Sequence, residues 1–283
     1  MPYEVDGAVG YLPMRYHDSD SFFALYTADL RSVTNALPSD AITPLRWLDG
    51  RALLMVAAYR WQRITWSGPD GSSGQLAPYG EVGVAALTSV GPAPRALPLL
   101  LDQATSTILQ LPVTTREARD GGRSIYGMPK FLADMDFAES PGTRSVRVSD
   151  QGEDILTLTV RLSGRFRSRT DSTVGHVSVN GELREIVSPS CGYSQLRFGA
   201  GGADLELGTH PVAQQIRELG IAPRPVAVMN TLRLSMVLPP PGARLGPARD
   251  VPCYPGRDDD HARYTVTYLG AEPIDMYASE HLV

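Results

Sequence analysis

The sequence contains almost no lysine. Lysine and arginine together number 26 in the 283-residue chain, and the only lysine among them is Lys130. Arginine occupies every other basic position. Its guanidinium stays protonated in proteins, whereas the primary amine of lysine can lose its proton when desolvated and act as a nucleophile. We therefore interpret Lys130 as a position where arginine would not serve. The alternative is a chance survivor of a compositional drift toward arginine.

Cysteine, long apolar runs and excess positive charge are also scarce. The two cysteines, Cys191 and Cys253, are far apart and lack CxxC spacing, which argues against a zinc site or a disulfide framework. No apolar run approaches the roughly 20 residues of a membrane-spanning helix, and the first residues lack a signal-peptide pattern. With a net charge of −5, the chain has no broad basic surface for nucleic acid. We expect a cytoplasmic protein that binds a small molecule and neither nucleic acid nor membrane.

Alternating and β-branched runs dominate the chain and predict a mainly β protein. The expected strands are 21–29, 51–64, 81–90, 145–150, 153–162 and 226–238. Asp150-Gln151-Gly152 and Asn180-Gly181 predict tight hairpin turns, and Gly199 to Gly202 predict a turn that brings 196–198 back toward 204–207. Such local pairing indicates an antiparallel sheet.

Three helices are expected around this sheet. The first follows Asp29, the second runs through 96–110, and the third runs over 209–220 with Thr209 as its N-cap and Gly220 as its stop. Neither an internal repeat nor a linker interrupts the pattern. We therefore expect one domain over residues 1–283.

The segment GRSIYGMPKF, residues 122–131, places the lone lysine among glycine, proline and aromatic residues. Gly127 and Pro129 predict a bent, stiff backbone, and Tyr126 and Phe131 predict an apolar environment. Desolvation penalises an ammonium, so a buried lysine can hold a useful fraction of free amine near neutral pH. The alternative is a lysine on a surface loop with its amine in solvent.

In this segment the sequence resembles the acetoacetate decarboxylase superfamily, whose motif ends in Gly-aromatic-Pro-Lys and whose motif lysine forms a Schiff base. Gly122, Arg123, Tyr126, Gly127, Pro129 and Lys130 match that motif in order. Residues 17–38, 78–87 and 209–241 resemble further family segments, so the likeness covers most of the chain. The resemblance implies an antiparallel β-barrel with a few flanking helices and exposed sheet edges that allow a homo-oligomer to form.

Several positions depart from the family pattern. Phe131 replaces a second lysine, Ser124 replaces a glutamate, and the family's carboxylate-binding arginine falls near Ser19. A further active-site glutamate aligns with the apolar stretch at residues 55–58. These departures argue against acetoacetate itself as the substrate.

The resemblance implies roles for six residues. Lys130 would be the Schiff-base nucleophile and Glu81 the proton shuttle, with an ion pair to an arginine as the alternative for Glu81. Residues expected at the substrate are Arg123, Tyr126, Met128 and Phe131. Arg123 would hold a substrate carboxylate or, as the alternative, make a structural pair inside the barrel.

Other motifs predict neither a cofactor nor a metal. GAGG at 199–202 is not followed by a helical pattern, which argues against a phosphate-binding loop. DDDH at 258–261 is typical of a solvated surface, and the five histidines show no paired ligand spacing. His210 is expected to be structural.

We therefore predict a lyase that forms a Schiff base with a keto acid or related carbonyl compound. A protonated imine accepts electrons from a breaking C–CO₂, C–C or C–H bond, so decarboxylation and aldol or dehydration chemistry are all open. We favour the aldol or dehydration type, in specialised metabolism. The alternatives are a non-catalytic barrel that binds a small molecule and a cyclase that uses the pocket without an imine.

Overall fold

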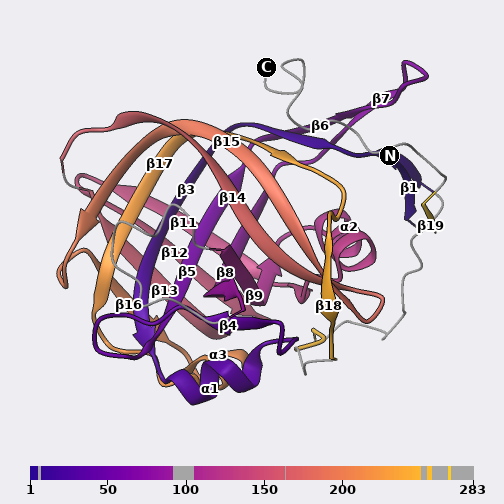
Figure 1. The fold of residues 1–283 in the computed structure, drawn as a ribbon. Helices are drawn as coiled ribbons and strands as arrows, with labels where there is room; N and C mark the ends of the chain where they lie inside the picture. The colour runs from indigo at the N-terminus through magenta and orange to yellow at the C-terminus, as the bar shows by residue number, and fades with distance from the viewer. Residues whose placement is uncertain (6–7, 92–104, 163, 250–253, 257–266, 269–283) are drawn as a thin grey trace.

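A closed barrel of seven strands forms the centre of the computed structural model, which describes residues 1–5, 8–91, 105–162, 164–249, 254–256 and 267–268 (Figure 1). Around the barrel the strands follow the order β9, β14, β15, β17, β3, β5 and β8, and β8 closes the ring by pairing with β9. Their bounds are β3 Met14–Ala28, β5 Ala52–Trp61, β8 Tyr79–Val90, β9 Thr105–Val113, β14 Arg167–Val179, β15 Glu182–Phe198 and β17 Pro225–Leu238. All neighbours in the ring are antiparallel except β14 and β9.

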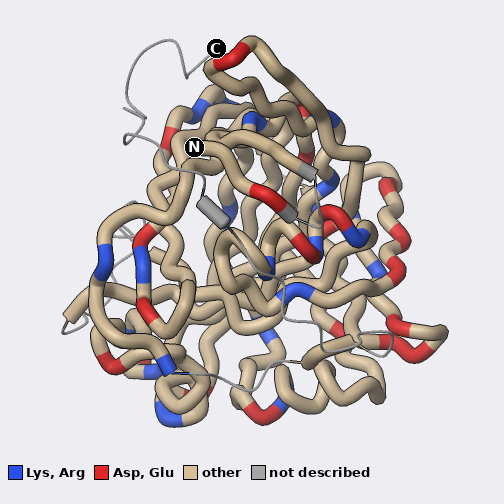
Figure 2. The backbone as a smooth tube through the Cα atoms, turned by 90° about the vertical axis from the view of Figure 1, so that its right-hand side faces the viewer, with Lys and Arg blue, Asp and Glu red and all other residues tan. Residues whose placement is uncertain are grey.

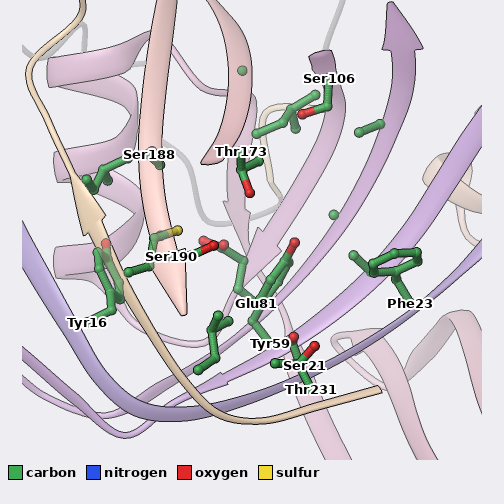
Figure 3. Close-up of a pocket in the computed structure, with 18 of the residues that line it drawn as sticks. Tyr16, Ser21, Phe23, Tyr59, Glu81, Ser106, Thr173, Ser188, Ser190 and Thr231 are labelled. Carbon is green, nitrogen blue, oxygen red and sulfur yellow. The ribbon is translucent and has the colours of Figure 1, made fainter. Parts of the chain in front are cut away.

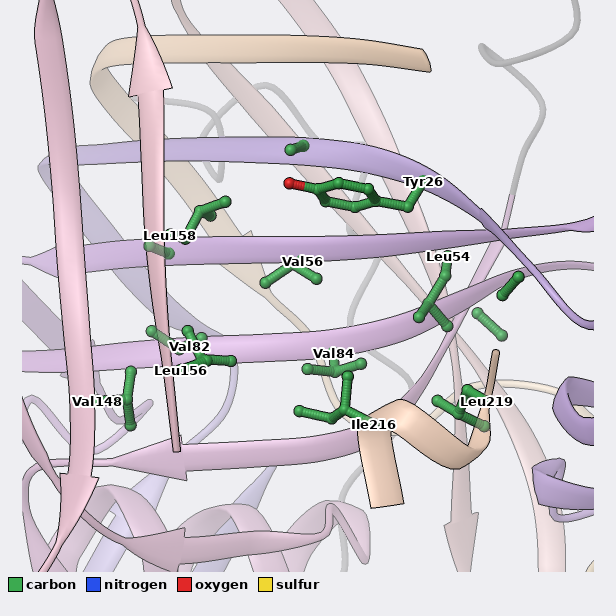
Figure 4. Packing of buried hydrophobic residues seen from close by; sticks show 14 of the residues in the cluster. Tyr26, Leu54, Val56, Val82, Val84, Val148, Leu156, Leu158, Ile216 and Leu219 are labelled. Carbon is green, nitrogen blue, oxygen red and sulfur yellow. The ribbon is translucent and has the colours of Figure 1, made fainter. Parts of the chain in front are cut away.

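A second, four-stranded antiparallel sheet packs against the outside of the barrel. Its order is β11, β12, β13 and β16, with bounds Asp134–Ser140, Thr143–Asp150, Glu153–Arg161 and Ala203–Leu207. The main hydrophobic core lies between this sheet and barrel strands β3, β5 and β8 (Figure 4). Val148, Leu156 and Leu158 face Val56 and Val82 across the core.

The two-residue period of a strand separates the core from the barrel interior. On β5, Leu54, Val56 and Ala58 belong to the outer core, whereas Met55 and Ala57 line a cavity inside the barrel. The same alternation holds on β3 and β8. The outer face of these barrel strands therefore packs into the main hydrophobic core, and their inner face lines the cavity.

Three helices lie against the sheets in the described part of the chain: α1 Leu30–Ala36, α2 Arg116–Tyr126 and α3 Pro211–Glu218. The predicted helix after Asp29 is confirmed as α1, with the Asp29 carboxylate accepting from Ser32 N at 2.8 Å. The late helix is confirmed as α3, but its N-cap is His210, whose Nδ1 accepts from Val212 N. Thr209 instead donates to Glu153.

Two predicted features are wrong. Residues 105–110 belong to strand β9, not to a helix, because their β-branched side chains fit a ladder with β8 and β14; the rest of that range lies outside the described residues. The turn after β15 does not pair β15 with β16. Strand β16 pairs with β13 in the outer sheet, where Leu205 and Leu207 reach the main core.

The two hairpin predictions are confirmed. Gln151 and Gly152 both have positive φ between β12 and β13, and Asn180 and Gly181 both have positive φ between β14 and β15. Positive φ at both central residues matches the right-handed twist of the flanking strands.

Shorter strands complete the fold. They are β1 Pro2–Val5, β2 Ala8–Tyr11, β4 Ile42–Pro44, β6 Arg63–Ser67, β7 Ser73–Leu76, β10 Lys130–Leu132, β18 Arg244–Pro247 and β19 Thr267–Tyr268. Basic and acidic positions are interspersed along the backbone (Figure 2). Among the described residues, no helix is both long and apolar enough to span a membrane.

Candidate active site

Lys130 is the first residue of β10 and is held by its backbone. Its N–H donates to Met128 O at 2.8 Å, and its carbonyl accepts from Arg123 Nε at 2.6 Å. The preceding helix α2 ends at Gly127, which has φ +60, and a side chain there would collide with the carbonyl oxygen of Ser178. The bend predicted for this motif is therefore a helix terminus followed by a short strand that runs parallel to β9.

The Lys130 side chain crosses the surface of α2 at Gly122. A Cβ on Gly122 would lie 2.6 Å from Lys130 Cε and 3.2 Å from Nζ. Real side chains do not approach this closely, so only glycine leaves room for the lysine stem. The match of Gly122 and Lys130 within one motif thus has a steric basis.

The lysine amine meets a carboxylate inside the barrel. Lys130 Nζ donates to Glu81 Oε2 at 2.7 Å, and both residues are buried, with exposed fractions of 5% and 9%. Trp61 Nε1 donates to the other carboxylate oxygen of Glu81 at 3.4 Å. An ammonium and a carboxylate this close form a charge-assisted hydrogen bond along which a proton can move.

Aromatic rings surround this pair. The amine lies 5.6 Å from the centroid of the Tyr79 ring, and the hydroxyls of Tyr79 and Tyr16 are 3.5 Å apart. The Trp61 ring stacks on Tyr59, with centroids 4.9 Å apart and planes inclined by 5°. These rings give the amine and the carboxylate largely apolar surroundings.

The tyrosines near Glu81 are neutral hydrogen-bonding groups. Burial raises the pKa of Tyr16, Tyr59 and Tyr79 well above that of a free phenol, and the negative charge of Glu81 raises each of them further. None of the three is a phenolate near neutral pH. They can donate hydrogen bonds but cannot act as bases there.

The pair opens into a cavity of about 260 Å³ enclosed by the barrel. Inward-pointing side chains from several barrel strands converge on its centre, among them Tyr59, Glu81, Thr173 and Ser21 (Figure 3). The cavity has an apolar part on β5, β8 and β9, formed by Met55, Ala57, Gly83, Ala85 and Ile108. It is large enough for an organic substrate beside Lys130.

The structure brings together three of the six residues predicted at the site. Lys130, Glu81 and Met128 all line the cavity. Phe131 points the other way, into the main core, where it lies 5.0 Å from the Tyr254 ring. This direction follows from strand alternation, because Lys130 and Phe131 are adjacent in β10.

Arg123 and Tyr126 are not among the described residues that line this cavity. The Arg123 guanidinium donates to the carbonyls of Lys130 and Pro255, and Arg123 lines a second pocket together with Pro129 and Arg249. The Tyr126 hydroxyl donates to Pro239 O at 2.8 Å. Both contacts hold backbone around the site, and neither side chain faces Lys130 Nζ from within the cavity.

Sequence reasoning missed the aromatic residues next to the pair. Tyr16, Trp61 and Tyr79 lie on three different strands, and each also fits an ordinary core position. Only the closure of the barrel brings them together. The proximity of Tyr79 and Glu81, two residues apart on one strand, was the one local signal.

Two of the departures from the family pattern have a clear place in the structure. Met55 and Ala57 make an apolar surface at the aligned position of the second glutamate. Ser19 is buried, and its hydroxyl donates to His17 O at 3.2 Å. Among the described residues no cluster of His, Cys, Asp and Glu has the geometry of a metal site.

A comparison with known protein families shows which family the chain belongs to. The family model described as acetoacetate decarboxylase (ADC) matches residues 1–236. The chain belongs to the acetoacetate decarboxylase family. A comparison with curated protein sequences found no match.

Solved structures share the fold of this family member at low sequence identity. Acetoacetate decarboxylase from Legionella pneumophila is 16% identical, with a TM-score of 0.56 over 82% of this chain and 88% of that one. The enduracididine biosynthesis enzyme MppR in complex with pyruvate is 15% identical, with a TM-score of 0.54 over 83% and 91%. An acetoacetate decarboxylase-like enzyme from Sphingomonas wittichii RW1 is 16% identical, with a TM-score of 0.53 over 83% and 93%.

Proposed function

We propose that this protein is a lyase that forms a Schiff base between Lys130 and a keto acid or related carbonyl compound. The observation that carries the proposal is the 2.7 Å contact between Lys130 Nζ and Glu81 Oε2 inside the barrel cavity. Family membership supports an enzyme of this type. The contact supports Lys130 as the nucleophile and Glu81 as its proton acceptor.

The Lys130 ammonium must lose a proton before its nitrogen can act as a nucleophile, and the Glu81 carboxylate is the proton acceptor beside it. It accepts a proton from Lys130 Nζ, and the freed amine lone pair adds to the substrate carbonyl carbon while a proton passes from the attacking nitrogen to the carbonyl oxygen, so Glu81 stays protonated. The carbinolamine then loses its hydroxyl as water, with the proton for that water coming from protonated Glu81. The product is a protonated imine beside a restored carboxylate, so charge balances at every stage.

The protonated imine is an electron acceptor for the following step. Electrons from a bond β to the imine nitrogen flow into the C=N group to give an enamine, and the enamine can then be protonated or can attack a second carbonyl carbon. We favour the aldol or dehydration outcome over decarboxylation. MppR has been solved with the condensation product of pyruvate and imidazole 4-carboxaldehyde, which supports this outcome and a role in specialised metabolism.

Because lysine is so scarce, reductive trapping with borohydride can identify the reacting amine without ambiguity. Besides Lys130, the chain has one primary amine, the N-terminal amino group, so a borohydride-reduced adduct has only two places to form. We would incubate the protein with pyruvate, acetoacetate and a panel of larger ketones and aldehydes, reduce it, and measure intact mass and peptide masses. We expect one adduct, localised to Lys130.

The Lys130→Arg variant is the matched control because it keeps the positive charge beside Glu81 and removes imine chemistry. We expect it to show no barrel adduct and no turnover. Turnover that survives in this variant would favour a cyclase without an imine. A wild-type chain left unmodified by the whole panel would favour a non-catalytic binding protein.

A further inference from the structure

Small hydroxyl side chains from four barrel strands line the cavity. Ser21 on β3, Ser106 on β9, Thr173 on β14, and Ser188 and Ser190 on β15 all line it, and Figure 3 shows them around its interior. Thr173 and Ser188 are direct cross-strand partners. The hydroxyls therefore form a band that crosses several strands, which we call the hydroxyl band.

These hydroxyls are not used to hold the fold together. Within the described part of the chain, none of the five makes a hydrogen bond to another side chain or to backbone. Ser21 and Ser188 are buried, with exposed fractions of 6% and 5%, whereas Thr173 is exposed, and none of the five hydroxyls is a sealed, unpartnered atom. Their donors and acceptors are available to a molecule in the cavity.

The charged groups of the cavity wall are mutually paired. Lys130 is bonded to Glu81, and Arg169 Nε donates to Asp171 Oδ2 at 2.8 Å on β14. Arg123, the arginine expected at a substrate carboxylate, lies outside this cavity with its guanidinium on backbone carbonyls. The apolar part of the lining comes from β5, β8 and β9. The cavity therefore offers hydrogen bonds and apolar contact rather than a dedicated cation.

The cavity is also too large for a short keto acid. Its volume of about 260 Å³ corresponds to about nine water molecules at roughly 30 Å³ each. Gly83, Ala57 and Ala85 keep the apolar side open by contributing almost no side chain. A molecule such as acetoacetate leaves much of this space unfilled.

We propose that the substrate is an uncharged, oxygen-bearing ketone or aldehyde longer than acetoacetate, whose hydroxyl or carbonyl oxygens lie along the hydroxyl band while its reacting carbonyl meets Lys130. The placement of the reacting carbonyl beside Lys130 rests on the proposed function. The band itself recognises the remainder of the molecule without any covalent step.

The test measures binding by calorimetry to three compounds. One is acetoacetate, one is an unbranched methyl ketone of seven carbons, and one is its dihydroxylated counterpart of the same length. We expect the dihydroxy ketone to bind about tenfold more tightly than the plain ketone, since two additional hydrogen bonds are available. Acetoacetate is expected to bind most weakly.

Variants locate the preference. The double variant Ser188→Ala/Ser190→Ala should lose about tenfold in affinity for the dihydroxy ketone and keep its affinity for the plain ketone. Ser172→Ala is the matched control, because Ser172 is exposed on β14 and does not line the cavity. Equal affinity of the two seven-carbon ketones, or equal loss of both in the double variant, would overturn the inference.

A second arm separates this inference from the Schiff-base proposal. The Lys130→Met/Glu81→Gln variant forms no imine and leaves no unpaired charge in the barrel. We expect it to retain the preference for the dihydroxy ketone. If the wild type shows the preference and this variant does not, recognition by the hydroxyl band is wrong. If the wild type forms no borohydride adduct but both proteins prefer the dihydroxy ketone, only the Schiff-base proposal is wrong.

Discussion

At Gly122 the lack of a side chain leaves the space that the Lys130 stem occupies. A Gly122→Ala substitution would place a methyl group against Lys130 Cδ and Cε and push the amine away from Glu81. We expect the rate of imine trapping at Lys130 to fall by about tenfold or more, since small displacements of a reacting group are costly. Single-turnover borohydride trapping measures this rate.

The neighbouring Gly121 provides a control in the same helix turn, because nothing lies within 4 Å of the position of its Cβ. Gly121→Ala should raise the free energy of unfolding by about 0.5–1 kcal/mol through helix propensity and leave trapping unchanged. If both alanine variants trap equally well, the steric role of Gly122 is wrong.

The Glu81 carboxylate is the proton acceptor nearest to the amine in the proposed mechanism. Glu81→Gln keeps the size of the side chain and a hydrogen-bonding oxygen but removes the base. We expect imine formation to slow by about 100-fold, the lower end of the range for general acid–base catalysis. Trp61→Phe, which removes the 3.4 Å donor to Glu81 and reduces the ring that stacks on Tyr59, leaves the carboxylate base in place and should have a smaller effect. Unchanged trapping in Glu81→Gln would remove Glu81 from the mechanism.

At the scale of elements, the junction between α2 and β10 sets the position of the lysine. Gly127 has φ +60, and its missing Cβ avoids Ser178 O on β14. Gly127→Ala should therefore lower the free energy of unfolding by about 2 kcal/mol or more, since it adds a clash to the cost of left-handed backbone. Urea unfolding followed by circular dichroism measures the change.

Gly142, in the turn between β11 and β12, separates the cost of left-handed backbone from the cost of the clash. Its φ is +81, but nothing lies within 4 Å of its Cβ position. Gly142→Ala should lower the free energy of unfolding by only about 1 kcal/mol. Equal losses at Gly127 and Gly142 would show that the contact with β14 contributes nothing.

Stability of the whole molecule should depend on the protonation of His176. Burial lowers the pKa of His176 to about 4, and its Nδ1 lies 3.1 Å from the Thr88 hydroxyl. A histidine whose pKa is lower in the folded state than in the unfolded state contributes full stability above pH 6.5, and that stability falls as the pH drops toward 4. We expect this residue alone to lower the free energy of unfolding by about 2 kcal/mol between pH 7 and pH 5.

Urea unfolding at the two pH values, in the wild type and in His176→Asn, isolates this contribution. The variant should be less stable at pH 7 but should lose about 2 kcal/mol less on acidification, because asparagine does not titrate. Parallel pH dependence in the two proteins would mean that His176 is not held neutral by the fold.

The chemistry of the motif could be read from the sequence, because it depends on residue types that are close in the chain. A lone lysine after Gly127 and Pro129 predicts a constrained amine, and alternating runs predict antiparallel strands with turns at Gly152 and Gly181. The motif and the turns are local properties, so short-range patterns are sufficient to indicate them. Glu81 was expected as a proton shuttle only through the family resemblance, and its contact with Lys130, 49 positions away in sequence, was not predicted.

The content of the cavity was decided only by the tertiary structure. Phe131 and Arg123 are close to Lys130 in sequence, yet strand alternation turns Phe131 into the core and the end of α2 directs Arg123 to backbone carbonyls. Tyr16 and Ser188 are remote in sequence, and closure of the barrel brings both to the cavity. Barrel closure joins strands by long-range hydrogen bonds, and no local pattern records which inward faces will meet.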